Sequence, residues 1–243
     1  HLSNQLKAVP EPTVYPRTTG KDGQLIATPK NDWTEGFYPG CLWYIYEHNR
    51  EESWKQSAVK WTEALEPMKK LTSHHDIGFL IYCSFGNGYR LTGKEEYKDV
   101  IIEAANSLTT RFSEVTGCIK SWNYRKAWNG KDEWFYPVII DNMMNLELLY
   151  FASKVTGDTR YAKIATTHAE TTAKNQLRED YSNYHVVDYD TLTGKVLHQA
   201  TCQGFSDNSA WARGQAWAIY GYTMVYRETR DKDFLRFAEK VAD

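Results

Sequence analysis

The sequence has few cysteines, and their spacing suits neither a metal site nor a disulfide framework. Cys41, Cys83, Cys118 and Cys202 are dispersed over 243 residues without a CxxC pair. Zinc-binding modules and small disulfide scaffolds need more closely spaced cysteines, so both classes are excluded. Because Cys41 and Cys83 stand in apolar helical stretches, we expect buried free thiols there.

The sequence also lacks a charge excess and a long apolar run. Lys and Arg total 29 and Asp and Glu total 31, which gives a net charge of −2. Nucleic acids and anionic membrane surfaces require clustered basic residues, so neither is an expected partner. No apolar run approaches the roughly 18 residues of a membrane span. His74 and His75 have no third ligand at a suitable spacing, so no metal site is predicted.

Aromatic residues, in contrast, are plentiful. The chain has 9 Trp, 17 Tyr and 9 Phe, together 14% of its residues. Rings of this kind can fill a wide core, or they can line a pocket that stacks on flat ligands such as sugar rings or bases. Composition by itself leaves both interpretations open.

Residues 1–30 and 31–243 differ in character. The first segment is polar and holds four of the seven prolines, which is typical of an arm or loop outside the core. In the second segment, apolar stretches such as 79–91 and 142–155 alternate with amphipathic stretches such as 97–108. A helix that is apolar on all sides is enclosed, whereas an amphipathic helix covers a core from outside.

The alternation forms a repeat. Each apolar helix ends at a polar marker residue, and an aromatic residue follows five positions later in the next helix; the markers are Asn49, Thr92, Thr156 and Thr229. A repeated helical hairpin predicts a solenoid or a closed α/α barrel, and inner helices this apolar favour the closed ring. Four hairpins are visible, so we expect part of a longer barrel. A glycine-containing turn also predicts a β-hairpin insertion near 184–198.

Chemistry-bearing residues stand where the inner helices begin. Counting back fifteen or sixteen residues from the markers reaches Trp33, Asp76, Asp141 and Arg213. If the units are equivalent, these side chains meet at one mouth of the barrel, as in a binding or catalytic site. Each Asp could equally be a helix N-cap. Asp141 follows an apolar run at 138–140, so we expect a buried carboxyl that holds a proton near neutral pH.

Five segments carry a resemblance to a known family. They are NDWTEGF (31–37), HDIGF (75–79), IIDN (139–142), SNYH (182–185) and SDNSAWARGQAW (206–217). In this order they resemble the unsaturated glucuronyl hydrolases of glycoside hydrolase family 88. That resemblance implies an all-α fold, an (α/α)6 barrel, of which this chain would supply about four of the six units as the N-terminal part of a catalytic domain.

The resemblance also implies roles for particular residues. Asp141 matches the general acid/base, and Asp76 matches a second carboxylate that contacts substrate hydroxyls. Neither a metal nor a cofactor is implied. The implied substrate-binding residues are Trp33, Phe79, Trp128, His185, Gln203, Trp211, Arg213 and Trp217. For His185 taken alone, a purely structural role is the more frequent one for a histidine.

The implied reaction releases a 4,5-unsaturated uronic acid from the non-reducing end of lyase-generated glycosaminoglycan oligosaccharides. It proceeds by protonation and hydration of the C4=C5 enol ether. The alternatives are an unsaturated rhamnogalacturonyl hydrolase on the same barrel, or a non-catalytic carbohydrate-binding barrel. A scaffold for protein partners is disfavoured, because the inner helices are nearly uncharged. The expected partner is thus an unsaturated uronic-acid oligosaccharide, bound by a monomer or weak homodimer in a bacterial cytoplasm or periplasm.

Overall fold

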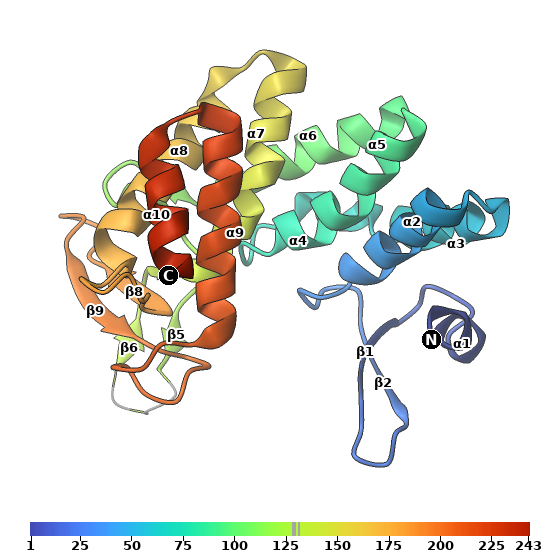
Figure 1. Ribbon diagram of the computed structural model, residues 1–243, viewed down its shortest axis with the longest axis horizontal. Coiled ribbons are helices and arrows are strands. Elements are labelled where there is room, and N and C mark those ends of the chain that lie inside the picture. Colours follow the sequence, from blue (N-terminus) through green and yellow to red (C-terminus); the bar gives the residue numbers. More distant parts are fainter. Residues whose placement is uncertain (128–129, 131) are drawn as a thin grey trace. The chain divides into compact units, whose positions relative to one another are not determined.

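The computed structural model describes residues 1–127, 130 and 132–243, and these form two compact units. Unit 1 comprises His1–Leu71 and Asp76–Ser107, and unit 2 comprises Thr72–His75 and Leu108–Asp243. Both are mainly helical, with short strands (Figure 1). Within the described ranges, no helix is long and apolar enough to cross a membrane.

Unit 1 consists of two helical hairpins preceded by a short helix and a β-hairpin. The first hairpin pairs α2 with α3, and α6 follows the second inner helix. Its elements, with α6 ending in unit 2, are α1 (Leu2–Ala8), β1 (Tyr15–Thr19), β2 (Leu25–Thr28), α2 (Phe37–Asn49), α3 (Glu52–Glu63), η1 (Glu66–Lys70), α4 (Ile77–Ile81), η2 (Tyr82–Gly86), α5 (Asn87–Thr92) and α6 (Glu95–Thr109).

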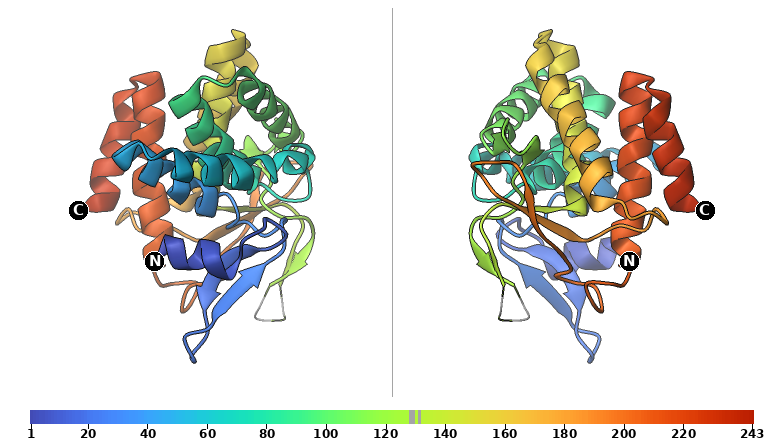
Figure 2. Two further views of the ribbon diagram at one scale, coloured as in Figure 1. Left: turned by 90° about the vertical axis from the view of Figure 1, so that its right-hand side faces the viewer. Right: turned by 90° about the vertical axis from the view of Figure 1, so that its left-hand side faces the viewer.

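Unit 2 holds two further helical hairpins, α7–α8 and α9–α10, whose helices lie side by side (Figures 1 and 2). Short strands precede the first hairpin and separate it from the second. The elements are β3 (Phe112–Ser113), β4 (Cys118–Ile119), β5 (Arg125–Lys126), β6 (Glu133–Trp134), β7 (Pro137–Ile139), η3 (Ile140–Asn145), α7 (Leu146–Thr156), α8 (Thr159–Gln176), β8 (Val186–Tyr189), β9 (Val196–Ala200), α9 (Ala212–Thr229) and α10 (Lys232–Ala242).

The four repeat markers form four equivalent turns. α2, α5, α7 and α9 end at Asn49, Thr92, Thr156 and Thr229, and the next helix begins three residues later each time. The residue after each marker is left-handed, with φ between 58° and 75°. Each marker side chain accepts the backbone N–H two residues on, at 3.1–3.2 Å. The turn is therefore built from local contacts, as expected for a helix stop of this kind.

Two inner helices are less regular than the sequence predicts. The stretch 79–91 falls within α4, the π-helical segment η2 and α5, and the stretch 142–155 starts in the 3-10 helix η3 before becoming α7. Asp76 immediately precedes the first and Asp141 lies at the start of the second. π segments inside helices occur frequently at functional sites, and η2 is such a segment, beginning six residues after Asp76.

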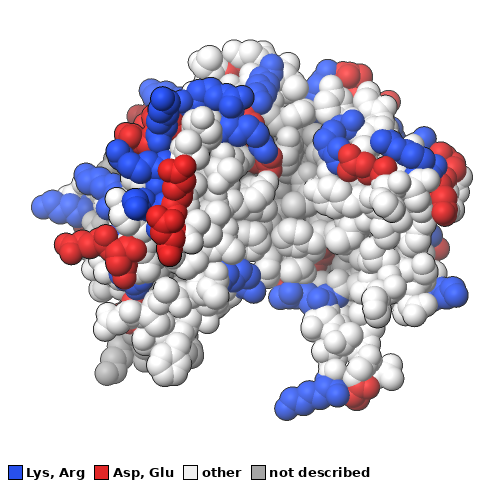
Figure 3. Space-filling model, viewed as in Figure 1, with Lys and Arg blue, Asp and Glu red and all other residues white. Residues whose placement is uncertain are grey.

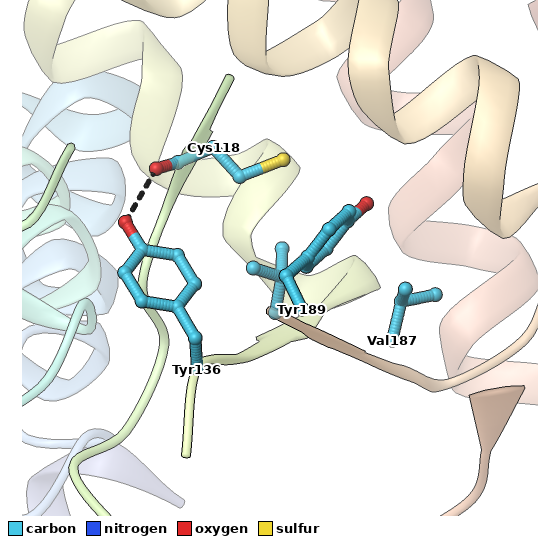
Figure 4. Close-up of a cluster of buried hydrophobic side chains, with 5 residues drawn as sticks. Cys118, Tyr136, Val187 and Tyr189 are labelled. Carbon is cyan, nitrogen blue, oxygen red and sulfur yellow. Dashed lines mark hydrogen bonds between the residues drawn. The ribbon is translucent and has the colours of Figure 1, made fainter. Parts of the chain in front are cut away.

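The predicted β-hairpin is present as β8 and β9, and a third strand joins it. β7 pairs antiparallel with β8, with Val138 opposite Val187, to give the order β7-β8-β9. The sheet contributes to a cluster of buried side chains that includes Cys118, Tyr136 and Tyr189 (Figure 4). The Tyr136 hydroxyl donates to the Cys118 carbonyl at 2.8 Å. The sequence did not predict β7, because its three residues carry no alternation.

Two expectations need correction. The arm 1–30 does supply a core residue, because Tyr15 is fully buried, stacks edge-on to Trp61 at 5.0 Å and donates to its carbonyl. Cys41 is exposed and Cys83 is only partly buried, so neither thiol is buried as expected, although all four cysteines are free as expected. The apolar neighbours of Cys41 in the sequence point to other faces of α2, which explains the error.

Ion pairs connect the two hairpins of unit 2 at their surface. Arg227 of α9 lies 2.5 Å from Glu147 of α7, and Lys154 pairs with Glu228. Basic and acidic side chains are intermixed on the face drawn in Figure 3, in keeping with the near-zero net charge. The basic partners of these ion pairs are exposed, whereas the Glu228 side chain is only 7% exposed.

Candidate active site

Asp141 lies on η3, which packs closely against α9. Two glycines of α9 make this approach possible: a Cβ on Gly221 would lie 2.3 Å from the Met143 Cβ, and one on Gly214 would lie 3.2 Å from Ile140 Cγ2. The Asp141 residue is only 6% exposed. η3 is therefore held tightly, and its carboxylate is placed with little freedom to move.

His185 lies beside this carboxylate and has a defined tautomer. Its Nδ1 accepts the backbone N–H groups of Cys202 and Gln203, at 3.0 and 3.2 Å. The proton of the neutral ring is therefore on Nε2, which lies 3.7 Å from Oδ2 of Asp141. Burial, and then the charges of Arg213 and Arg125, lower the pKa of His185 to about 3. At neutral pH the site thus holds a neutral N–H donor next to a buried carboxyl.

Two indoles border the histidine. The Trp211 ring lies 4.3 Å from the His185 ring, and the Trp122 ring lies 6.4 Å from it and perpendicular. Each indole carries a guanidinium on its face, Arg213 on Trp211 at 4.5 Å and Arg125 on Trp122 at 4.7 Å. Indoles with guanidiniums stacked on them combine apolar surface with positive charge, which suits a flattened, negatively charged sugar.

A series of buried hydrogen bonds holds the residues on either side of Asp141. The neighbouring Asn142 donates through Nδ2 to the Ile119 carbonyl at 2.8 Å, and the Ile119 N–H donates to Nδ1 of His168 at 3.0 Å. His168 is fully buried, and burial lowers its pKa to about 3. On the other flank, the Ile140 N–H donates to the His185 carbonyl at 3.1 Å. These bonds fix the backbone on both sides of the carboxylate.

Unit 1 holds the other predicted site residues. Trp33, Phe37 and Phe79 form a three-ring cluster with centroid distances of 5.4–5.9 Å. Asp76 is the N-cap residue of α4, the helix that carries Phe79, yet its side chain makes no capping hydrogen bond. Asp141 is not the N-cap of η3 either, since Ile139 has that position. The capping interpretation therefore holds for neither carboxylate.

The structure also places an unforeseen buried acid in unit 1. Glu35 is fully buried, and neither carboxylate oxygen accepts a hydrogen bond of normal geometry from a described residue. Burial, followed by the charge of Asp32, raises its pKa from 4.5 to about 8. Nearby backbone N–H groups and Arg17 offset only part of this rise.

Five of the residues predicted from the sequence are brought together in unit 2: Asp141, His185, Gln203, Trp211 and Arg213. Arg213 donates to the side-chain oxygen of Gln203, and this hydrogen bond connects α9 to the loop that follows β9. Trp217 follows Arg213 by one helical turn on α9, so both share a face. Trp128 lies outside the described residues.

Sequence reasoning missed Trp122 and Arg125. A signal was present in the run SWNYR (121–125), where aromatic and basic residues interleave within a loop. Over the described part of the chain, no group of three or more His, Cys, Asp or Glu side chains is arranged to hold a metal ion.

The family model of Glycosyl Hydrolase Family 88 matches residues 10–240. The chain belongs to this family. It is 48% identical over 227 residues to an unsaturated glucuronyl hydrolase of Formosa agariphila, covering 93% of this chain and 56% of that protein. It is 39% identical over 225 residues to an unsaturated chondroitin disaccharide hydrolase of Streptococcus agalactiae, covering 89% and 54%. The chain thus spans a little over half the length of these relatives.

Solved structures agree. A crystal structure of an unsaturated glucuronyl hydrolase specific for heparin superposes with a TM-score of 0.93 at 45% identity, covering 99% of this chain and 63% of that one. A structure of the enzyme from Bacillus sp. GL1 superposes with a TM-score of 0.90 at 31% identity, covering 99% of this chain and 63% of that one. The predicted fold class, an α/α barrel of helical hairpins, is confirmed by these similarities.

Proposed function

We propose that the protein is a glycoside hydrolase that removes 4,5-unsaturated uronic acids from oligosaccharides, with Asp141 as general acid and base. One observation carries the proposal: the Asp141 carboxyl is buried, and its Oδ2 lies 3.7 Å, just beyond hydrogen-bond distance, from Nε2 of His185, the ring nitrogen that carries the proton. A donor in this position can orient the carboxylate and stabilise it after it has given up its proton.

The reaction needs a single group that first donates and then accepts a proton. The Asp141 carboxyl transfers its proton to C4, and the C4=C5 π electrons form the new C4–H bond. C5 becomes an oxocarbenium-like centre stabilised by the ring oxygen. Water adds to C5 while the Asp141 carboxylate accepts the proton that water releases. The hemiketal then opens, its C5–O5 bond breaks, and the hemiacetal at C1 expels the glycosidic partner, leaving an aldehyde.

Other residues receive binding roles in this proposal. Trp211 offers a face to the flattened sugar, and Arg213 and Gln203 together present hydrogen-bond donors and an acceptor to its polar groups. Asp76 acts as the second carboxylate, which contacts substrate hydroxyls. Trp33, Phe79 and Trp217 complete the substrate-binding set, with Trp128 as a further candidate.

The proposed substrates are disaccharides from glycosaminoglycans, taken by a monomer or weak homodimer. The relatives reported above are named for glucuronyl and chondroitin disaccharide hydrolysis, and one is described as specific for heparin. These names favour glycosaminoglycan fragments over the pectin fragments of the rhamnogalacturonyl alternative.

The test uses the full-length protein and the ultraviolet absorbance of the conjugated double bond. Unsaturated chondroitin, hyaluronan and heparin disaccharides are each mixed with the protein, with an unsaturated pectin fragment as comparison. Loss of absorbance with a glycosaminoglycan disaccharide supports the proposal. Loss with the pectin fragment alone would favour the rhamnogalacturonyl reaction, and no loss with any of them would leave a binding role.

A further inference from the structure

Arg125 of β5 has no role in the reaction as derived above, yet it is placed like a binding residue. Its Cζ lies 4.7 Å from the Trp122 ring centroid, and Arg213 repeats this arrangement on Trp211 at 4.5 Å. Both indoles border the ring of His185, at 6.4 and 4.3 Å. Two stacked guanidiniums therefore flank one histidine.

The charge of Arg125 acts inside the site. It contributes to lowering the pKa of His185, and it opposes the rise that burial causes in the pKa of the Cys202 thiol. The Arg125 side chain is nevertheless exposed. Among the residues that the structure describes, no carboxylate forms an ion pair with it. A cation close enough to His185 to lower its pKa is thus left without an ion-pair partner among the described residues.

Stacking determines what this cation can bind. A guanidinium that lies flat on an indole keeps its N–H groups in one plane, directed past the ring edge. That geometry suits two parallel hydrogen bonds to a carboxylate or sulfate. An anionic sugar approaching Asp141 also needs positive charge nearby, because a deprotonated Asp141 would repel it.

We propose that Arg125 is a specificity-determining residue that binds an oxyanion of the substrate. The oxyanion is either the carboxylate of the unsaturated uronate or a sulfate ester on the adjoining sugar. This inference deepens the proposed function and rests on it for the identity of the saccharide.

The experiment compares Arg125→Gln, Arg125→Lys and a matched control in the full-length protein. The control is Arg160→Gln, because Arg160 also lies on an aromatic ring, that of Tyr161, but is paired with Asp158 at 3.5 Å on α8. KM and kcat are measured with an unsulfated disaccharide, a sulfated one, and the methyl ester of the unsulfated one. Thermal melts verify that each variant is folded.

We expect Arg125→Gln to raise KM about 10- to 100-fold with little change in kcat, as for the loss of a charge-assisted hydrogen-bond pair. The KM of Arg125→Lys should be intermediate, because lysine keeps the charge but lacks the planar pair of N–H donors. The KM of Arg160→Gln should match that of the wild type. If the KM of Arg125→Gln rises for both unesterified substrates but not for the methyl ester, the uronate carboxylate is the oxyanion that Arg125 binds. A rise confined to the sulfated substrate identifies the sulfate.

An unchanged KM for Arg125→Gln on every substrate, with an active wild type, overturns the inference and leaves the proposed function standing. If the wild type is inactive, the proposed function fails, and calorimetric binding of the same disaccharides decides about Arg125. Weaker binding by Arg125→Gln than by Arg160→Gln then supports the oxyanion site, and equal binding overturns it.

Discussion

Two buried carboxyl groups in this chain occupy contrasting environments. Asp141 in unit 2 lies within 3.7 Å of a neutral histidine, and hydrogen bonds fix the backbone on both of its sides. Glu35 in unit 1 is fully buried, lacks a hydrogen bond of normal geometry from the described residues, and has the like charge of Asp32 nearby. Polar groups around a buried carboxyl can stabilise its ionised form. Without them, burial makes ionisation of the carboxyl unfavourable.

The comparison predicts opposite outcomes when the two acids are neutralised. Replacement of Asp141 should remove activity and leave stability nearly unchanged. Replacement of Glu35 should alter stability and its dependence on pH.

The largest effect is expected for Asp141→Asn in the proposed reaction. The amide cannot give a proton to C4 or take one from water, so kcat should fall by about 10²- to 10⁴-fold. The ultraviolet assay measures the rate, and circular dichroism verifies the fold. Activity within about tenfold of the wild type would contradict the assignment of the general acid.

Glu35→Gln should change the pH dependence of folding. The raised pKa means that the folded state keeps a proton which the unfolded state loses, so wild-type stability falls as pH rises from about 4.5 to about 8 and then levels off. The amide cannot ionise, so the variant should lack this slope. Above pH 8 it should be more stable by a few kcal/mol, since one pKa unit equals about 1.4 kcal/mol.

Urea unfolding of wild type and Glu35→Gln across this pH range provides the measurement. Asp32→Asn is the matched control: it removes the second cause of the raised pKa, so it should narrow the pH range over which stability falls without abolishing the fall. Parallel pH profiles for wild type and Glu35→Gln would show that Glu35 is not the group responsible.

A smaller effect is expected at His168, which supports the backbone next to Asp141. His168→Leu leaves the buried Ile119 N–H without its acceptor, which should cost about 1–3 kcal/mol of unfolding free energy. Because Ile119 in turn accepts from Asn142, kcat should fall more than KM changes. His168→Asn offers an acceptor at a similar position and should recover part of both losses. Equal stability of the wild type and the Leu variant would contradict this chain of contacts.

The smallest effect concerns the repeat turns. Thr156→Val removes the acceptor for the Asp158 N–H, so it should lower the free energy of unfolding by about 0.5–1 kcal/mol. Thr156→Ser keeps the hydroxyl and should stay close to the wild type. Thermal denaturation of the pair measures the difference, and activity should be unaffected in both.

Much of the helical architecture was predictable from the sequence. The ends of the inner helices follow from markers such as Asn49 and Thr92, because the contacts that stop each helix span only two to four residues. The amphipathic stretch 97–108 is found within α6, and the hairpin near 184–198 is found as β8 and β9. Local chemistry decides such features, so they are readable without the fold.

The active-site candidates were predictable only in part. Asp141 was reached by counting back from a repeat marker, whereas its role and the choice of His185 and Trp211 came from the family motifs, since the repeat does not distinguish site residues from capping, structural or core residues. Trp122 and Arg125 were not predicted, because their place in the candidate site depends on their stacking against each other and on their closeness to His185. The contact between Trp122 and His185 joins residues 63 positions apart.

The sequence by itself determined where the helices stop, which of their faces are apolar and which family the motifs resemble. Tertiary structure alone decided the ring proton of His185, which depends on N–H groups of Cys202 and Gln203, and the burial that separates Glu35 from an ordinary surface acid. The reason is physical: helix stops need only neighbours along the chain, whereas a tautomer or a pKa depends on donors, charges and solvent exclusion brought from distant segments.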